Sequence, residues 1–157
     1  RAALTAVALT IFVAEAQIPP VVPVPGVKLG LANIVTLVTM ALLGRREAGA
    51  VLVVRLILGS AFAGGFSGLM FSAAGGAAAY IVMCLLIKVF PEKLMWVVSV
   101  LAALAHNAGQ LAVAVWVSGS ASMLYYGTVL AAAGVITGVF TGFGAMYLTR
   151  AAKKLVK

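Results

Sequence analysis

Acidic residues are almost missing from this sequence. Among its 157 residues there is no aspartate, and the only carboxylate side chains are those of Glu15, Glu47 and Glu92. Glu47 and Glu92 stand beside basic residues in predicted turns. Magnesium in phosphate-handling enzymes is usually held by carboxylates together with the substrate phosphates. A paired-aspartate magnesium site is therefore excluded.

Histidine and cysteine occur only once each, as His106 and Cys84. A multi-histidine metal centre is absent, and a Cys/His catalytic pair is implausible because the two residues lie on different predicted spans. A lone cysteine in an apolar run is typical of a packing residue. The glycines lack the strand and lysine of a phosphate-binding loop. We therefore expect no enzyme active site, resident cofactor or metal.

Long apolar runs dominate the rest of the sequence. Hydrophobic residues make up 64% of the chain and charged residues 9%, with a mean hydropathy of +1.20. Several runs reach the length that crosses about 30 Å of hydrocarbon. There is no linker, low-complexity tract or clear internal repeat. Residues 1–157 are thus predicted to form one integral membrane domain, an all-α bundle of six transmembrane helices.

Prolines, glycines and charged turns separate the predicted spans. The spans run from Ala2 to Ile18, Leu29 to Leu43, Ala48 to Ala63, Leu69 to Val89, about Leu94 to Val117 and about Met123 to Thr149. We expect the first to be a retained span, because it is long and lacks the cleavage pattern of a signal peptide. The sixth carries Gly134, Gly138 and Gly142 at four-residue spacing, which predicts close packing against a neighbouring helix.

The basic residues indicate the orientation. With six spans, one face carries nine of them: Arg1, Arg45, Arg46, Lys88, Lys93, Arg150, Lys153, Lys154 and Lys157. Lys28 is the only one in a loop on the other face. Because cytoplasmic loops are enriched in Lys and Arg, both termini are predicted to be cytoplasmic in a multi-pass protein of the cell membrane. The net charge of +8 is therefore a topology signal and does not indicate nucleic acid as a partner.

The stretch from Pro19 to Asn33 holds four of the five prolines, with Lys28 between two apolar runs. Proline removes backbone donors and restricts the preceding residue, which predicts irregular or extended backbone. Such backbone is tolerated near a bilayer only where protein or a water-filled cavity satisfies its polar groups. The stretch is either a plain connector or a lid over an outward-facing site.

Two charged residues, Glu15 and Arg55, fall within the predicted spans. An ionisable side chain at that depth costs at least a few kcal/mol, so both are expected to face the bundle interior. One interpretation is a structural ion pair between them. The other is that Arg55 and Lys28 attract the carboxylate or phosphate of a ligand.

A polar turn in the fifth span contains His106, Asn107 and Gln110. His106 and Gln110 share a helix face, while Asn107 is displaced by about 100°. These side chains either hydrogen-bond neighbouring helices or line a cavity beside Asn33. The second interpretation predicts a substrate-binding set of Lys28, Asn33, Arg55, His106, Asn107 and Gln110.

Three segments carry a resemblance to a known family: Pro25 to Ile34, Arg55 to Ser60 and Ala105 to Gln110. They resemble the membrane family called heptaprenyl diphosphate synthase component I, or Gx transporter, over nearly the whole chain. That family is similar to the substrate-binding S components of energy-coupling factor (ECF) transporters, six-helix bundles whose long first loop covers an outward site. The resemblance also implies that Ala2 and Ala6, which fit an Ala-x-x-x-Ala pattern, pack against a coupling subunit.

Two functions follow from these observations. The first is a subunit that captures a small anionic vitamin- or cofactor-like molecule from outside, with lipid around it and a separate coupling subunit and ATPases as partners. The second is a membrane subunit associated with prenyl diphosphate or quinone metabolism or with membrane redox proteins. Lys28 on the outer face favours transport, because a prenyl diphosphate made in the cytosol would need a cationic site on the inner face.

Overall fold

The computed structural model describes residue 10, residues 30–61 and residues 65–155. All regular secondary structure in these residues is helical, as the sequence predicts. The α-helices are α2 (Asn33–Leu43), α3 (Arg45–Gly59), α4 (Gly65–Leu86), α5 (Met95–Ser118) and α6 (Gly127–Leu155), joined in places by the 3-10 helices η2 (Glu92–Leu94) and η3 (Ala121–Tyr126). The predicted first span lies outside the described residues apart from Thr10.

Three helical segments in the described part are long and apolar enough to cross a membrane. They are Gly65–Leu86, Glu92–Ser118 and Ala121–Lys154. By contrast, α2 has 11 residues and α3 has 15, which correspond to only about 16 and 22 Å of helix. The protein is therefore of the membrane type, whereas the predicted count of six spans is not confirmed.

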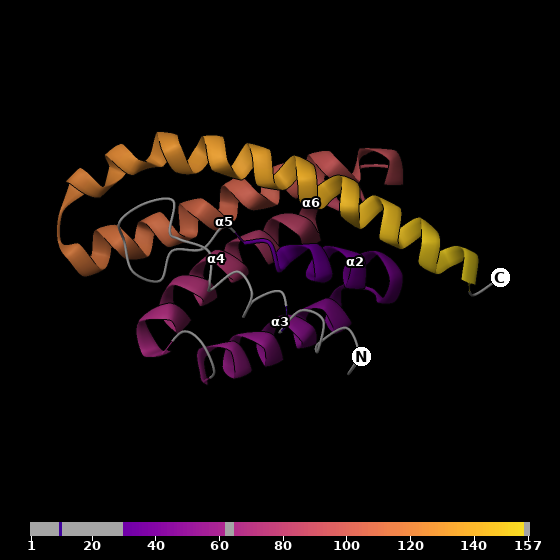
Figure 1. Ribbon diagram of the computed structural model, residues 1–157, viewed down its shortest axis with the longest axis horizontal. Helices are drawn as coiled ribbons and strands as arrows, with labels where there is room; N and C mark the ends of the chain where they lie inside the picture. The colour runs from indigo at the N-terminus through magenta and orange to yellow at the C-terminus, as the bar shows by residue number, and fades with distance from the viewer. Residues whose placement is uncertain (1–9, 11–29, 62–64, 156–157) are drawn as a thin grey trace.

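The short helix α2 lies inside the bundle, between α3 on one side and the α5–α6 pair on the other (Figure 1). It packs against α3, α4, α5 and α6. Six consecutive residues from Val35 to Met40 are buried, so the helix is covered on every side. A helix that is apolar all round is typical of such a buried position. The long helices α5 and α6 run antiparallel and make the most extensive contact in the molecule.

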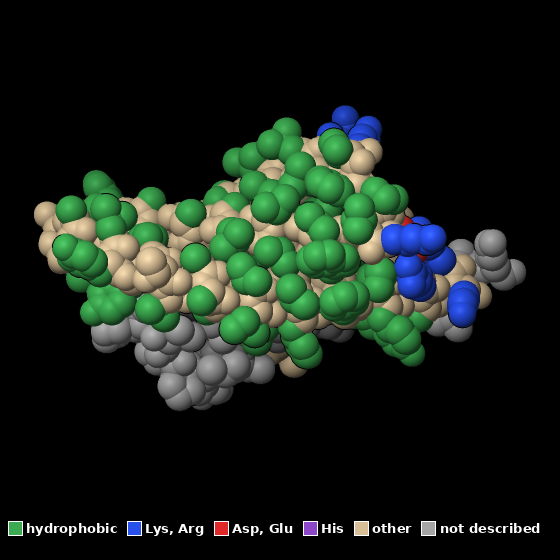
Figure 2. Space-filling model, turned by 90° about the horizontal axis from the view of Figure 1, so that it is seen from above, with side chains coloured by type: hydrophobic (Ala, Val, Ile, Leu, Met, Phe, Trp, Pro, Cys, Tyr) green, Lys and Arg blue, Asp and Glu red, His purple; other side chains and the backbone are tan. Residues whose placement is uncertain are grey.

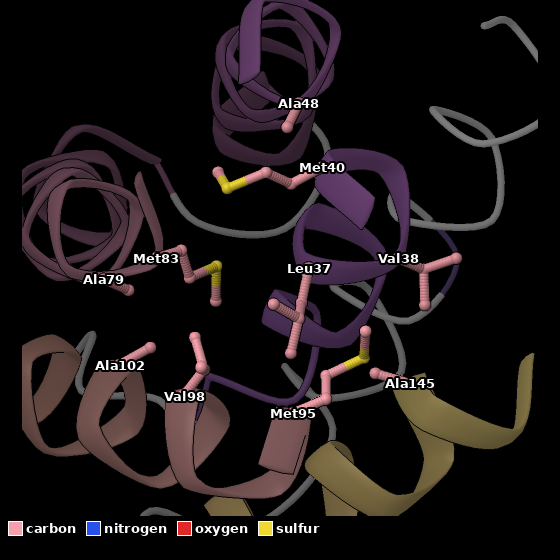
Figure 3. Close-up of a cluster of buried hydrophobic side chains, with 10 residues drawn as sticks. All are labelled: Leu37, Val38, Met40, Ala48, Ala79, Met83, Met95, Val98, Ala102 and Ala145. Atoms are coloured by element: carbon pink, nitrogen blue, oxygen red, sulfur yellow. The ribbon is translucent and has the colours of Figure 1, made fainter. Parts of the chain in front are cut away.

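The hydrophobic core draws residues from all five α-helices (Figure 3). Leu37 of α2 is fully buried and points toward Val98 of α5. Met83 of α4 approaches the same space from the other side. The complete cluster is Leu37, Val38, Met40, Ala48, Ala79, Met83, Met95, Val98, Ala102 and Ala145. Four of its members are alanines, which let the helices approach closely around the larger leucine and methionine side chains.

The glycine stripe of α6 packs against α5, as predicted. A Cβ atom added at Gly138 would lie 2.5 Å from the Cα atom of Val100, and one at Gly142 would lie 2.5 Å from the Cα atom of Trp96. Beside these contacts, the hydroxyl oxygens of Ser99 and Thr141 are 2.9 Å apart. The two backbones thus meet at a distance that only glycine permits.

Several predicted helix boundaries need correction, and three helix starts show why. Helix α3 begins at Arg45 instead of Ala48, because Gly44 turns the chain with a φ of 97° and the charged residues after it form the first helical turn. Helix α4 begins at Gly65 instead of Leu69, so most of the glycine-rich stretch between the third and fourth predicted spans is helical. Residues Met123 to Tyr126 belong to η3, and α6 starts only at Gly127.

Seven described basic residues gather at one end of the bundle: Arg45, Arg46, Lys88, Lys93, Arg150, Lys153 and Lys154. The Tyr80 hydroxyl in the last part of α4 donates to the carbonyl of Arg45 over 2.9 Å. Glu92 pairs with Arg150 over 3.3 Å and also with Lys153, which joins η2, directly before α5, to the end of α6. Figure 2 shows Lys and Arg side chains toward one end of the long axis and hydrophobic side chains over the rest of this face. These seven residues therefore share one end, as the sequence predicts.

We predict that Gly138→Ala destabilises the protein. Overpacking costs about 1–3 kcal/mol, and the new methyl group would meet backbone of α5, so the cost should exceed the gain of about 1 kcal/mol in helix propensity. The measurement is the thermal unfolding midpoint in detergent. Gly127→Ala on the same helix is the control, since its Cβ atom meets only the flexible Leu111 Cδ2 at 3.2 Å. A midpoint for Gly138→Ala at or above that of the control would contradict the close contact.

Candidate functional site

His106 is the centre of a buried polar cluster. It lies in α5 and is only 4% exposed. Its Nδ1 atom is 3.2 Å from Nδ2 of Asn33 in α2, and its Nε2 atom is 3.0 Å from Nε2 of Gln110, one turn further along α5. A neutral imidazole has one N–H donor and one acceptor nitrogen, so only one of the two amide nitrogens can donate to it. The ring N–H can donate to the backbone carbonyl of Gly75, which also hydrogen-bonds the ring, or to the oxygen of the other amide. The tautomer of His106 and the orientation of both amides are thereby coupled.

Two glycines make room for the imidazole. A Cβ atom at Gly75 of α4 would lie 2.8 Å from Cε1 of His106. On the other side, a Cβ atom at Gly30 would lie 3.0 Å from Cδ2. Gly30 also has a φ of 76°, and its carbonyl accepts a hydrogen bond of 2.9 Å from the Asn33 N–H at the start of α2. The chain segment that enters α2 therefore lies directly against the ring.

Arg55 brings a positive charge to the same region from α3. Its side chain is 2% exposed, and its Nη2 atom lies 3.6 Å from the position that a Cβ atom of Gly76 would take. It is also close enough to His106 for the two groups to interact electrostatically. The adjacent glycines Gly75 and Gly76 of α4 thus face His106 and Arg55, respectively.

The cluster lies at a similar depth on four helices. Counted from the basic end, it is ten residues away on α2 (Leu43 to Asn33), ten on α3 (Arg45 to Arg55), ten on α4 (Leu86 to Gly76) and eleven on α5 (Met95 to His106). At 1.5 Å per residue these distances are about 15–17 Å. This is roughly half the thickness of a hydrocarbon core of about 30 Å. The cluster therefore lies near the middle of the bundle.

Asn107 points away from this cluster. Its Nδ2 atom donates to the carbonyl of Leu130 in α6 over 2.6 Å, and it packs where a Cβ atom of Gly134 would otherwise lie. The displacement of about 100° from His106 explains this direction. Among the described residues, its Oδ1 atom has no hydrogen-bond partner. Asn107 joins α5 to α6, whereas Asn33, Arg55, His106 and Gln110 come together.

Two buried hydroxyl groups near the cluster were not predicted. Ser72 lies one turn before Gly75 and Gly76 on α4, and Thr36 lies one turn after Asn33 on α2. Within the part of the chain that the structure describes, neither Ser72 Oγ nor Thr36 Oγ1 has a hydrogen-bond partner. A helical hydroxyl usually bonds to its own backbone, as Thr39 does to the carbonyl of Val35, so sequence alone does not distinguish such groups. Their three- and four-residue spacing from cluster residues is the only signal.

Four residues discussed in the sequence analysis lie outside the described residues: Lys28, Glu15, Ala2 and Ala6. The lid, the partner contact and the Glu15–Arg55 pair therefore stay predictions. Within the described residues, no group of three or more His, Cys, Asp or Glu side chains could hold a metal ion. The functional groups of the described cluster are one guanidinium, one imidazole and two amides, with two buried hydroxyls one helical turn away from cluster residues. Such a set can bind and orient a polar molecule.

The fold and the cluster define a helical protein of the membrane type with a buried polar cluster among apolar helices. The chain belongs to the family described as heptaprenyl diphosphate synthase component I, whose model matches residues 4–148. This confirms the resemblance found in the sequence. No curated protein and no solved structure matches the chain.

We predict that Gly75→Ala displaces the His106 ring, because both ring nitrogens are already held and the new methyl group would overlap Cε1. Gly76→Ala is the matched control, since its Cβ atom meets the flexible Leu52 Cδ1 at 3.1 Å and reaches Arg55 Nη2 only at an ordinary contact distance of 3.6 Å. The chain has a single histidine, so nitrogen-15 labelling of histidine reports this ring alone. The ring signals should shift in Gly75→Ala and stay in place in Gly76→Ala. Identical signals in both variants would contradict the arrangement.

Proposed function

We propose that this protein is the substrate-binding membrane subunit of an ECF-type importer and takes a small anionic vitamin- or cofactor-like molecule. The observation that carries the proposal is the buried cluster of Arg55, His106, Asn33 and Gln110 near the middle of an apolar bundle. An ionisable residue at such depth is costly and marks a functional site by default. A purely structural role would not need polar groups from three different helices.

The cluster suits a ligand with an anionic group and a polar ring. The guanidinium of Arg55 can hold a carboxylate or phosphate through two parallel hydrogen bonds. The amides of Asn33 and Gln110 and the His106 ring offer donors and acceptors beside it. Ser72 and Thr36 add hydroxyl groups that such a ligand would satisfy.

Lys28 supplies a second cation in this proposal. It precedes Gly30 by two residues, so its Cα atom is within about 7 Å of a residue that touches the His106 ring. The proline-rich segment from Pro19 onward would then cover the ligand from the outer side. The proposal thus adopts the lid interpretation in place of a plain connector.

Import requires partners, because the sequence has no phosphate-binding loop for ATP. The proposal therefore includes a transmembrane coupling subunit and ATPases. Ala2 and Ala6 of the first predicted span would form the contact with the coupling subunit. The complete subunit would be a bundle of six transmembrane helices like those of S components, with α2 and α3 as its shorter members.

The family description favours one alternative, a membrane subunit associated with prenyl diphosphate or quinone metabolism. In that case the chain would hold a prenyl chain for an enzyme that carries the magnesium site. The lack of aspartate in this sequence makes catalysis by the chain itself the weaker interpretation.

The orientation belongs to this proposal, with the basic end in the cytoplasm. We predict that, in a Cys84→Ala background, Ala121→Cys reacts with a membrane-impermeant maleimide added outside intact cells. Lys154→Cys should react only after the cells are opened. Both sites are exposed; Ala121 lies in η3 before the start of α6, and Lys154 lies in the last turn of α6, at the opposite end. Reaction of both cysteines from the outside would show that the topology is wrong.

Native mass spectrometry of the purified protein should reveal a retained small anionic molecule. We predict that Arg55→Gln weakens its binding by about 10- to 100-fold, the effect of losing a charged hydrogen bond of about 1.5–3 kcal/mol. Asn33→Ala should also weaken it, whereas Asn107→Ala should bind within about two-fold of the natural chain because its amide is used by α6. Equal losses in Asn33→Ala and Asn107→Ala would remove the cluster as the binding site.

Uptake of the ligand into liposomes tests the import part of this proposal. Uptake of the identified ligand should require the coupling subunit, the ATPases and ATP together with this chain. Ala6→Trp should abolish uptake by obstructing the coupling contact and leave ligand retention unchanged. Uptake by the chain alone would instead indicate a self-sufficient carrier, and prenyl transfer in the same preparation would support the enzyme-associated alternative.

A further inference from the structure

A cavity opens at the basic end, where the turn between α2 and α3 meets the end of α4. Its volume is about 590 Å³, within the range of about 300–1,000 Å³ that is typical of small-molecule sites. The lining combines apolar and charged residues: Met40, Ala41, Leu43, Gly44, Arg45, Arg46, Glu47, Ile87 and Lys88. It is thus an amphipathic cavity, well separated from the polar cluster in the middle of the bundle.

The electrostatics of this cavity favour an anion. Arg45, Arg46 and Lys88 contribute three positive charges, and Glu47 is the one acid in the lining. Among the described residues these three cations form no ion pair, in contrast to Arg150 and Lys153, which both pair with Glu92. The positive end of the α3 dipole also points here, because the helix begins at Arg45 without a side-chain cap.

The apolar part of the lining distinguishes an amphiphile from a soluble anion. Met40, Ala41 and Leu43 come from α2, and Ile87 lies directly after the end of α4. Leu43 is 50% exposed, so the apolar wall continues onto the outer surface of the bundle. A free phosphate would gain nothing from this wall, whereas the upper part of an acyl chain would pack against it.

We propose that this cavity binds the headgroup of an anionic phospholipid, with the phosphate among Arg45, Arg46 and Lys88 and the first chain carbons against Met40, Leu43 and Ile87. The cavity lies at the end of apolar helices, the level at which headgroups lie in a bilayer. Basic pockets between helices at this level bind acidic lipid headgroups. The bound lipid would hold the α2–α3 turn against the end of α4. This proposal does not depend on whether the chain transports a solute.

The test uses the whole protein in nanodiscs that contain equal amounts of phosphatidylglycerol and phosphatidylcholine, followed by native mass spectrometry of the lipids retained. The target variant is Arg46→Gln/Lys88→Gln. The control variant, Lys93→Gln/Lys154→Gln, removes the same charge from exposed residues at the same end that do not line the cavity. The single variant Lys88→Gln is outside both α3 and the turn, so it repeats the measurement without touching their fold.

The natural chain should retain phosphatidylglycerol in preference to phosphatidylcholine. The target variant should lose roughly 10- to 30-fold in affinity for phosphatidylglycerol, since each cation near a membrane surface contributes about five-fold. The control should stay within about two-fold. Equal loss in target and control, or equal retention of the two lipids by the natural chain, would overturn the proposal. Displacement of the lipid by millimolar inorganic phosphate would show that the site takes a soluble phosphate instead.

Discussion

The burial of the His106 imidazole among apolar helices is the constraint on which this structure depends. A buried polar ring is tolerated only when both nitrogens have partners, and here Asn33 and Gln110 provide them. Each partner must come within about 3 Å, which brings α2 and α5 together. Gly75 gives the space on the α4 side. The hydrogen bonds of the polar cluster therefore require the close packing of the helices around it.

Helix α2 shows how this constraint shapes the fold. It is too short to cross a membrane by itself, and it is covered by four neighbouring helices. Its start carries Asn33 into the polar cluster, and its middle supplies Leu37 to the hydrophobic core. A helix enclosed in this way can present polar atoms in the middle of the bundle without exposing them to lipid, which is the condition for a binding site at that depth.

The charged side chains are also kept away from lipid. Arg55 is enclosed in the middle, whereas seven other basic residues of the described chain lie at one end. At that end Glu92 neutralises part of the charge by pairing with Arg150 and Lys153. Among the described residues, the cations around the α2–α3 turn form no ion pair. The bundle thus has two separate cationic regions, one enclosed in its middle and one open at its end.

The sequence by itself determined the all-helical membrane class, the family, the shared end of the basic residues and the glycine face of α6. These features follow from hydropathy, loop charge and helical periodicity, which are local properties of the chain. It also predicted that Asn33, Arg55, His106 and Gln110 could meet. Only the tertiary structure decided that Asn107 turns to α6, that Ser72 and Thr36 are buried without a hydrogen-bond partner among the described residues, and that α2 is short and enclosed. Those outcomes depend on how helices distant in sequence are rotated against one another, which no local pattern encodes.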